Sequence, residues 1–321
     1  EEAAKAMDMM LEGTASPVLV SAFLTALRMK GETVDEIVGC TEMMKSKGGS
    51  VKFDTDEYID FVGTGGDGAN SFNISTTSMF VCAAAGVTVA KHGNRAASSK
   101  SGASDLLEAL GANIMLEPKQ VEQCINETGM GFMNAMKFHK AMKNVGPIRK
   151  EIGIRTIFNM LGPLSNPSNA SRQVIGVFSP EKGRVFAKVM SEMGVKRAMI
   201  VCGSDGMDEI TVTGKTLVNE IIDGKIVVYE IDPHDYGIEY AAASDITGGD
   251  GKENAEIAKS IFNGEKSARR DIIVLNSAAG IYIGGKADSY KKAVEIAKQT
   301  IDSGKVMDKV NEFVAETKKF N

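Results

Sequence analysis

The sequence predicts an α/β protein in which a small helical domain accompanies a larger α/β domain with a mostly parallel sheet. The chain up to about Gly49 shows helical periodicity, and beyond Val51 short β-type runs alternate with helical ones. Glycine-rich turns follow two of the strand-like runs. Alternating strands and helices are the pattern of βαβ units, which pair their strands in parallel. With 43% hydrophobic and 25% charged residues, the composition is typical of a soluble globular protein.

The N-terminal region is predicted to be helical from its apolar spacing and from the residues at the helix ends. The opening segment Glu1–Gly13 reads as the middle of a helix and lacks the basic and apolar regions of a signal peptide, so native residues are expected before it. Ser16 and Pro17 are a typical N-cap and first helical residue, and Gly31 ends the helix that they begin. A further helix is predicted for Val34–Met44.

The middle and C-terminal parts of the chain contain the predicted strands. Short β-type runs occur at Tyr58–Val62, Val87–Ala90, Arg197–Cys202 and Ile272–Leu275. Between them, Met133–Asn159 reads as helix and irregular loop rich in Met and Lys, so we expect a helical domain that is discontinuous in sequence. We therefore predict a helical domain of residues 1–56 and about 135–162, and an α/β domain of residues 57–134 and about 163–321.

The cysteines and histidines exclude several kinds of site. The four cysteines form no C-x-x-C pair, which argues against a zinc ribbon, a redox dithiol or a disulfide scaffold and favours a reducing cytoplasm. The three histidines are far apart in the sequence, so any metal is expected to be bound by oxygen. No apolar run reaches the roughly 18 residues of a membrane span, and no membrane partner is predicted.

The distribution of charge indicates a site for a small anion. The net charge of −5 argues against nucleic acid as a partner. However, Gly68–Ser104 contains no Asp or Glu, and Thr128–Pro180 contains Glu151 as its one acid among several lysines and arginines. Two acid-free stretches in an acidic protein favour a focused anion site. Burial of these stretches is the alternative explanation.

The first glycine-rich turn predicts a phosphate-binding loop. Gly63–Gly68 follows the strand-like run that ends at Val62, and an apolar helix begins near Asn73. Glycines allow a close backbone approach to a ligand, and the N–H groups of a helix N-terminus attract phosphate. The same turn matches the dinucleotide pattern G-x-G-x-x-G. That alternative fits poorly because the second strand ends in Lys91, where an NAD site requires an acid, although an NADP site tolerates lysine.

Two further segments are expected beside this loop. Lys91–Arg95 and Ser98–Gly102 follow the second strand and precede a predicted helix at Ala103–Leu110. Successive βα turns meet at the carboxyl edge of a parallel sheet, where they could hold a second phosphate, although loop and helix capping also explains the serines. Asp208 and Glu209 follow the strand near Val201, and adjacent carboxylates there suit Mg²⁺ bridging to phosphates. A solvated surface pair is the alternative for these two acids.

Four long segments give the chain a resemblance to a known family. GTGGDGANSFNIST, KHGNRAASSKSGASDLLEALG, HKAMKNVGPIRKEIGIRTIFNMLGPLSNP and GMDEIT resemble the anthranilate phosphoribosyltransferases in order and spacing. The likeness runs through essentially the whole chain. It implies a fold like that of nucleoside phosphorylases and phosphoribosyltransferases. It also implies transfer of the phosphoribosyl group from 5-phosphoribosyl 1-pyrophosphate (PRPP) to the amine of anthranilate, with Mg²⁺, in tryptophan biosynthesis, usually by a homodimer.

The resemblance also implies roles for individual residues. Lys91 and Arg149 would be the catalytic residues, with anthranilate held by Gly63, Asn94 and Arg149, and Mg²⁺ held by Ser75, Asp208 and Glu209. The implied PRPP contacts come from the two βα turns and the helices that follow them: Gly63, Gly66, Asp67, Ser71, Asn73, Ile74, Ser75, Thr76, Lys91, His92, Gly93, Asn94, Arg95, Ala96, Ala97, Ser98, Ser99 and Ala103.

The chain departs from the family pattern at four of the matched positions. Ala103 stands where many relatives have Ser, and Met136, Phe138 and Asn144 replace the commoner Pro, His and His. The last three changes concern the anthranilate channel more than the PRPP site.

The expected chemistry agrees with these residues. Cleavage of the C1–pyrophosphate bond builds negative charge on the leaving group, which Lys91, loop N–H groups and Mg²⁺ would stabilise. Arg149 could pair with the anthranilate carboxylate and orient the amine, which is already neutral and needs no strong base. Two alternatives stay open. One is an enzyme like a pyrimidine nucleoside phosphorylase, which would use phosphate as nucleophile. The other is a non-catalytic relative that binds phosphoribosyl groups or nucleic acid.

Overall fold

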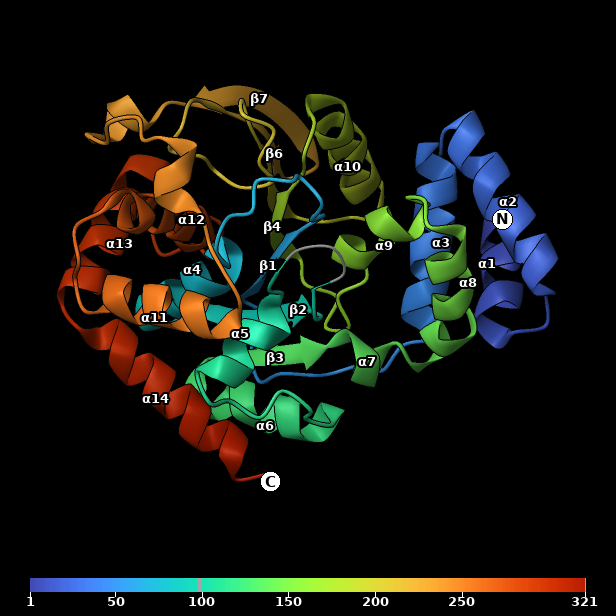
Figure 1. The fold of residues 1–321 in the computed structure, drawn as a ribbon, viewed down its shortest axis with the longest axis horizontal. Coiled ribbons are helices and arrows are strands. Elements are labelled where there is room, and N and C mark those ends of the chain that lie inside the picture. The colour runs from blue at the N-terminus through green and yellow to red at the C-terminus, as the bar shows by residue number, and fades with distance from the viewer. Residues whose placement is uncertain (97–99, 321) are drawn as a thin grey trace.

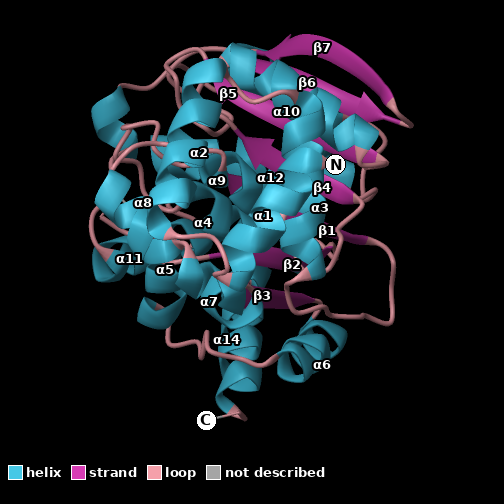
Figure 2. Ribbon diagram, turned by 90° about the vertical axis from the view of Figure 1, so that its right-hand side faces the viewer, coloured by secondary structure: helices cyan, strands magenta, loops and turns pink. Residues whose placement is uncertain are grey.

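The fold is built around one seven-stranded sheet (Figures 1 and 2). A computed structural model describes residues 1–96 and 100–320. The strand order is β3-β2-β1-β4-β5-β6-β7, with parallel pairing from β3 to β5 and antiparallel pairing of β6 with β5 and β7. The mostly parallel sheet is therefore confirmed. The strands are β1 (Tyr58–Gly63), β2 (Thr88–Gly93), β3 (Met130–Asn134), β4 (Arg172–Gly176), β5 (Arg197–Gly203), β6 (Thr216–Ile222) and β7 (Lys225–Ile231).

Three of the four predicted strands are present, as β1, β2 and β5, and the fourth prediction is wrong. Ile272–Leu275 lies inside helix α12 (Ala268–Ile283), where all four side chains are buried. A short apolar run has the same composition in a buried strand and in a buried helix, so only its surroundings distinguish the two. The β6–β7 hairpin was not predicted. Its turn is Asp223-Gly224, with positive φ angles of 48° and 77°, which is the sequence type that closes tight hairpins.

The second helix begins and ends where the sequence predicts, and the third begins where predicted but ends at Ser46 instead of Met44. The Ser16 hydroxyl accepts a hydrogen bond from the Leu19 N–H at the start of the second helix, and Gly31 ends it. Thr33 and Glu36 form a reciprocal capping box at the start of the third. These helices are α1 (Glu2–Glu12), α2 (Pro17–Lys30) and α3 (Val34–Ser46).

A return segment of the chain packs against these three helices. Figure 1 shows α8 beside α1, α2 and α3 at the right of the molecule. Val145, Phe158 and Leu161 share a buried apolar cluster with Met7, Leu24 and other residues of the first three helices. This packing supports a discontinuous helical domain, whose boundaries stay a prediction. The return segment consists of α7 (Ala135–Phe138), the 3-10 helix η1 (Lys140–Asn144), α8 (Gly146–Ile152) and α9 (Phe158–Leu164).

The remaining helices surround the sheet. Helix α4 packs on β1 and β2, α12 packs on α4 and β4, and α10 packs on β5 and β6. In the described residues, no helix combines the length and the apolar character that crossing a membrane requires. These helices are α4 (Ile74–Ala84), α5 (Ala103–Ala109), α6 (Pro118–Thr128), α10 (Pro180–Glu192), η2 (Pro233–Tyr236), η3 (Ala243–Ile246), α11 (Gly251–Phe262), α12, α13 (Tyr290–Asp302) and α14 (Lys305–Lys318).

Candidate active site

The predicted site residues gather at the carboxyl edge of the parallel strands. The loop of residues 63–68 follows β1, and residues 203–209 follow β5, which is separated from β1 only by β4. Two hydrogen bonds join these loops: the Gly65 N–H donates to Asp208 Oδ2 at 2.6 Å, and the Asp208 N–H donates to Asp67 Oδ2 at 3.4 Å. Segments far apart in the sequence therefore form one site at this edge, where open α/β folds bind ligands.

The loop after β1 presents unpaired backbone N–H groups. Gly65, Gly66 and Gly68 have φ angles of 65°, 74° and 77°, in the left-handed region that favours glycine. The Thr64 N–H donates to the Gly176 carbonyl at 2.9 Å. Within the part of the chain that the structure describes, the N–H groups of Gly66, Asp67 and Gly68 have no hydrogen-bond partner. Successive free N–H groups in such a turn form a concave site for an anion.

Three carboxylates converge beside this loop. Glu209 accepts a hydrogen bond from the Ser75 N–H at the start of α4, at 3.1 Å, and lies next to Asp208. Burial, with Asp67 nearby, raises the pKa of Asp208 to about 7, and burial and Asp208 raise the pKa of Glu209 well above its usual value. A cation would relieve this repulsion. The described residues contain no group of three His, Cys, Asp or Glu side chains that encloses a metal. Mg²⁺ takes one or two carboxylates and completes its shell with water and substrate oxygens, so the pair Asp208 and Glu209 has the chemistry that this ion prefers.

Two strand-end glycines allow the 208–209 segment to approach the sheet. A Cβ atom on Gly176, the last residue of β4, would overlap the backbone carbonyl of Asp208, and one on Gly63 would lie 2.5 Å from Asp208 Oδ2. Gly63 was among the predicted site residues, but Gly176 was not. Nothing in the sequence around Gly176 indicates that another loop crosses directly over it.

Lys91, which was predicted to stabilise the departing pyrophosphate, is buried in the structure. Its side chain is 2% exposed, and its ammonium donates a hydrogen bond to the Phe61 carbonyl below the loop. Burial lowers the pKa of Lys91, while Asp60, Glu209 and Asp208 raise it. The lysine is therefore a buried counter-charge for Asp60 first and then for Glu209 and Asp208, because β2 continues through Gly93 and carries position 91 into the sheet.

The side chains of His92 and Arg95 are also engaged within the protein. His92 is buried against His139, with ring centroids 5.0 Å apart, and burial lowers its pKa to about 3, which keeps it neutral. Arg95 pairs with Glu108 at 2.6 Å and with Asp105 at 3.1 Å. A ligand contact from either side chain would require these interactions to change. The predicted residues Ala97, Ser98 and Ser99 lie outside the described residues.

Asn73 connects the two βα turns. Its side-chain oxygen accepts hydrogen bonds from Ser101 Oγ at 2.9 Å and Asn254 Nδ2 at 2.8 Å, and its amide donates to the Ser101 carbonyl. Ser71 forms an isolated bridge with Thr247. The other predicted residues of these turns are placed as follows: Ile74 and Thr76 are buried, Ser75, Gly93, Ala96 and Ala103 are half-buried, and Asn94 is exposed.

Arg149 lies in the return segment that packs against the first three helices. It lies near the end of α8, half-buried, with its guanidinium 5.0 Å from the centre of the Phe158 ring. Burial lowers its pKa. Among the described residues, no carboxylate forms an ion pair with Arg149. A half-buried cation without an acidic partner is available to an anionic ligand.

The three departures from the family pattern near this helix have different environments. Met136 is 59% exposed and Phe138 is buried. Asn144 donates a hydrogen bond to the Leu11 carbonyl at 2.7 Å, which ties η1 to α1. Phe138 therefore packs into the core around the sheet, Asn144 ties η1 to α1, and Met136 is the most exposed of the three.

Arg155 also lies at the site, although it was not among the predicted site residues. Its guanidinium donates a hydrogen bond to the Gly66 carbonyl and lies 4.4 Å from the centre of the Phe178 ring. It belongs to the basic stretch 128–180, which was the available signal. Its contact with the glycine loop could not be inferred, because the two segments are joined only by the fold.

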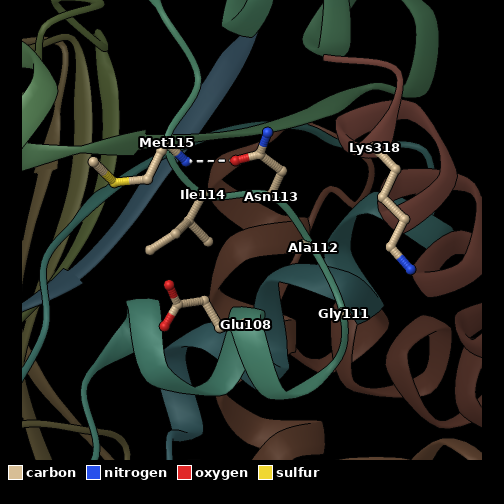
Figure 3. Close-up of a pocket in the computed structure, with 7 residues that line it drawn as sticks. All are labelled: Glu108, Gly111, Ala112, Asn113, Ile114, Met115 and Lys318. Carbon is tan, nitrogen blue, oxygen red and sulfur yellow. Dashed lines mark hydrogen bonds between the residues drawn. The ribbon is translucent and has the colours of Figure 1, made fainter. Parts of the chain in front are cut away.

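A separate cavity of about 230 Å³ lies at the other end of α5 (Figure 3). Its walls come from the end of that helix, the loop after it and α14, and contain none of the predicted site residues. Within this wall, the Met115 N–H donates a hydrogen bond to Asn113 Oδ1 at 3.0 Å. The cavity is lined by Glu108, Gly111, Ala112, Asn113, Ile114, Met115 and Lys318.

Comparison with known proteins gives full-length matches. Models of the glycosyl transferase family match residues 1–48 (helical bundle domain) and 55–307 (a/b domain). The chain is 52% identical to an anthranilate phosphoribosyltransferase of Acetivibrio thermocellus, over 99% of this chain and 92% of that protein. It is 50% identical to an anthranilate phosphoribosyltransferase of Methanobrevibacter smithii, over 99% of this chain and 94% of that protein.

Two solved structures of this kind are also similar over nearly the whole chain. The enzyme of Thermus thermophilus has a TM-score of 0.94 and 40% identity, covering 99% of this chain and 95% of that one. The Saccharomyces cerevisiae enzyme in complex with PRPP and Mg has a TM-score of 0.91 and 29% identity. The match covers 99% of this chain and 93% of that one.

Proposed function

Because the chain belongs to the anthranilate phosphoribosyltransferase family, we propose that its site transfers the 5-phosphoribosyl group from PRPP to the amine of anthranilate, releasing pyrophosphate. The likeness over 99% of the chain carries this proposal. The reaction belongs to tryptophan biosynthesis. The glycine loop, the carboxylates and Arg149 supply the anion, cation and acceptor sites that the reaction requires.

The loop after β1 is proposed to bind the phosphates of PRPP. The free N–H groups of Gly66, Asp67 and Gly68 would donate to phosphate oxygens. Asp208 and Glu209, with Ser75, would hold Mg²⁺, whose charge stabilises the departing pyrophosphate when it is bound. The buried charge of Lys91 also acts on these two acids, after Asp60. The remaining PRPP contacts, including Asn94 and residues 97–99, stay proposals from the family resemblance.

We propose that Arg149 binds the acceptor. A guanidinium can form two parallel hydrogen bonds with the carboxylate of anthranilate. This pairing would point the neighbouring amine toward C1 of the ribose, and holding the two reactants in line is a large part of catalysis. The arylamine is neutral at pH 7 and has a free lone pair, so attack needs no strong base.

Replacing Arg149 by alanine is expected to raise the KM for anthranilate by about a hundredfold, because a charge-assisted bidentate pair is lost. The KM for PRPP should change less than about threefold. Steady-state kinetics with each substrate varied in turn would measure both. Lys143→Ala, which removes an exposed positive charge from η1, is the matched control. Equal effects of Arg149→Ala on the two KM values would contradict the assignment.

The stability of the ligand-free protein should depend on pH through Asp208. Its pKa is raised to about 7, so the folded protein binds this proton more tightly than the unfolded chain does. Stability is then expected to rise by about 1 kcal/mol as the pH falls from about 8 to about 6. Mg²⁺ competes with this proton for Asp208. The increase in Tm that Mg²⁺ causes should therefore be larger at about pH 8 than at about pH 6. Thermal unfolding at the two pH values, with and without Mg²⁺, measures both effects. The Asp208→Asn variant should lose most of the pH dependence and most of the increase in Tm with Mg²⁺.

The activity itself is tested with purified protein, anthranilate, PRPP and Mg²⁺. Loss of anthranilate fluorescence that requires all three components would support the proposal. Turnover of a pyrimidine nucleoside that requires inorganic phosphate would favour the nucleoside phosphorylase alternative. Binding of PRPP or DNA without turnover of any acceptor would favour a non-catalytic relative.

The oligomeric state and the cellular compartment of the protein are predicted from its sequence. A homodimer is expected from the family resemblance, and light scattering of the purified protein would test it. A reducing cytoplasm is favoured by the four cysteines, which are free and buried.

A further inference from the structure

Arg155 joins the segment between α8 and α9 to the glycine loop. Its Nη2 donates a hydrogen bond to the Gly66 carbonyl, and its guanidinium stacks over the Phe178 ring at 4.4 Å. Phe178 follows β4, so the aromatic ring is held by the central sheet. In the part of the chain that is described, no carboxylate lies within ion-pairing distance of Arg155. The guanidinium is therefore held in place by an aromatic face and by the loop alone.

This contact determines the orientation of one peptide group in the loop. The peptide between Gly66 and Asp67 is planar and trans, so its carbonyl and its N–H point in opposite directions. When Arg155 binds the carbonyl, the Asp67 N–H is directed to the opposite side of the loop. That N–H and its neighbour on Gly68 are among the groups left without partners. Without the arginine, the conformational freedom of Gly66 would let this peptide rotate.

The space above Gly66 is filled by the same side chain. A Cβ atom on Gly66 would collide with Arg155 Nη2, and the positive φ of 74° already favours glycine there. The loop and the arginine therefore fit each other, and neither contact depends on a bound ligand.

We propose that Arg155 is a positioning residue, which holds the glycine loop in the shape that binds the pyrophosphate of PRPP. It also links this loop to the chain segment that carries Arg149. The part of the site proposed to bind PRPP is therefore connected through Arg155 to the part proposed to bind anthranilate. This inference rests on the proposed function, since it assigns the loop to PRPP. Its role is exerted through the Gly66 carbonyl and does not require contact with the substrate.

Replacing Arg155 by alanine is expected to raise the KM for PRPP by about tenfold or more, while the KM for anthranilate changes less than about threefold. Binding of Mg²⁺-pyrophosphate, measured by calorimetry, should weaken by a similar factor. Phe178→Leu keeps the guanidinium but removes its aromatic support, so it should shift both quantities in the same direction by a smaller factor. Arg155→Lys should restore only part of the loss, because an ammonium lacks the planar surface that stacks on the ring.

Arg184→Ala, which removes an exposed positive charge from α10, is the control for net charge. Unchanged pyrophosphate binding in folded Arg155→Ala would overturn the proposal. Full recovery in Arg155→Lys together with wild-type behaviour of Phe178→Leu would also overturn it, because the arginine would then act as a direct charge. If Arg155→Ala does not fold, the lysine and leucine variants still decide. Pyrophosphate binding needs no acceptor, so this test is separate from failure of the wild-type protein to use anthranilate.

Discussion

Changing Asp208 to asparagine and Glu209 to glutamine together is expected to lower turnover by about a thousandfold or more, because the departing pyrophosphate would lose the cation that stabilises it. The fold should survive, since an amide oxygen can still accept the hydrogen bonds from the Gly65 and Ser75 N–H groups. The ligand-free variant should unfold at a higher temperature than the wild type. Two acids with raised pKa values repel each other in the folded state, and the amides remove that repulsion.

Turnover as a function of Mg²⁺ concentration, circular dichroism and thermal unfolding would measure these three effects. The double variant Asp223→Asn with Glu239→Gln removes two exposed acids with the same change in net charge and serves as the control. Mg²⁺-dependent turnover at the wild-type level in the Asp208 and Glu209 variant would refute the metal assignment. Lost turnover with an unfolded protein would leave the fold, rather than the metal, as the cause.

Replacing Gly176 by alanine is expected to destabilise the protein by about 3 kcal/mol or to reduce turnover by about a hundredfold. The new Cβ would overlap the backbone carbonyl of Asp208, and no side-chain rotation can relieve a collision with backbone. The 207–209 segment would have to move away from β4. This movement would separate Asp208 from the Gly65 N–H, which donates a hydrogen bond to it. Thermal unfolding and the Mg²⁺ dependence of turnover would show which of these costs dominates.

Gly39→Ala is the matched control for this substitution. It lies inside α3, and its Cβ would be 3.6 Å from the Ala4 side chain, which is an ordinary contact. Alanine there should be neutral or slightly stabilising, because it has the higher helix propensity. Wild-type stability and turnover in Gly176→Ala would contradict this prediction. They would mean that residues 207–209 can move away from β4 without destabilising the protein or lowering its activity.

Local sequence was sufficient where a structure depends on neighbouring residues. The Ser16 cap, the glycine loop before α4 and the strands β1, β2 and β5 were all predicted, because each depends on a few adjacent residues. The prediction failed at Ile272–Leu275, where an apolar run is compatible with either element and burial between α4 and the sheet decides for helix.

The sequence by itself determined the fold class, the glycine loop, the paired acids and the likeness to the family. The tertiary structure decided which of those groups meet and which are covered. Lys91 is buried because β2 runs on past it, and Arg155 reaches Gly66 because α8 and α9 return to the sheet edge. Such contacts depend on strand order and on packing between distant segments. No short pattern records them, since the residues that make them are neighbours only after folding.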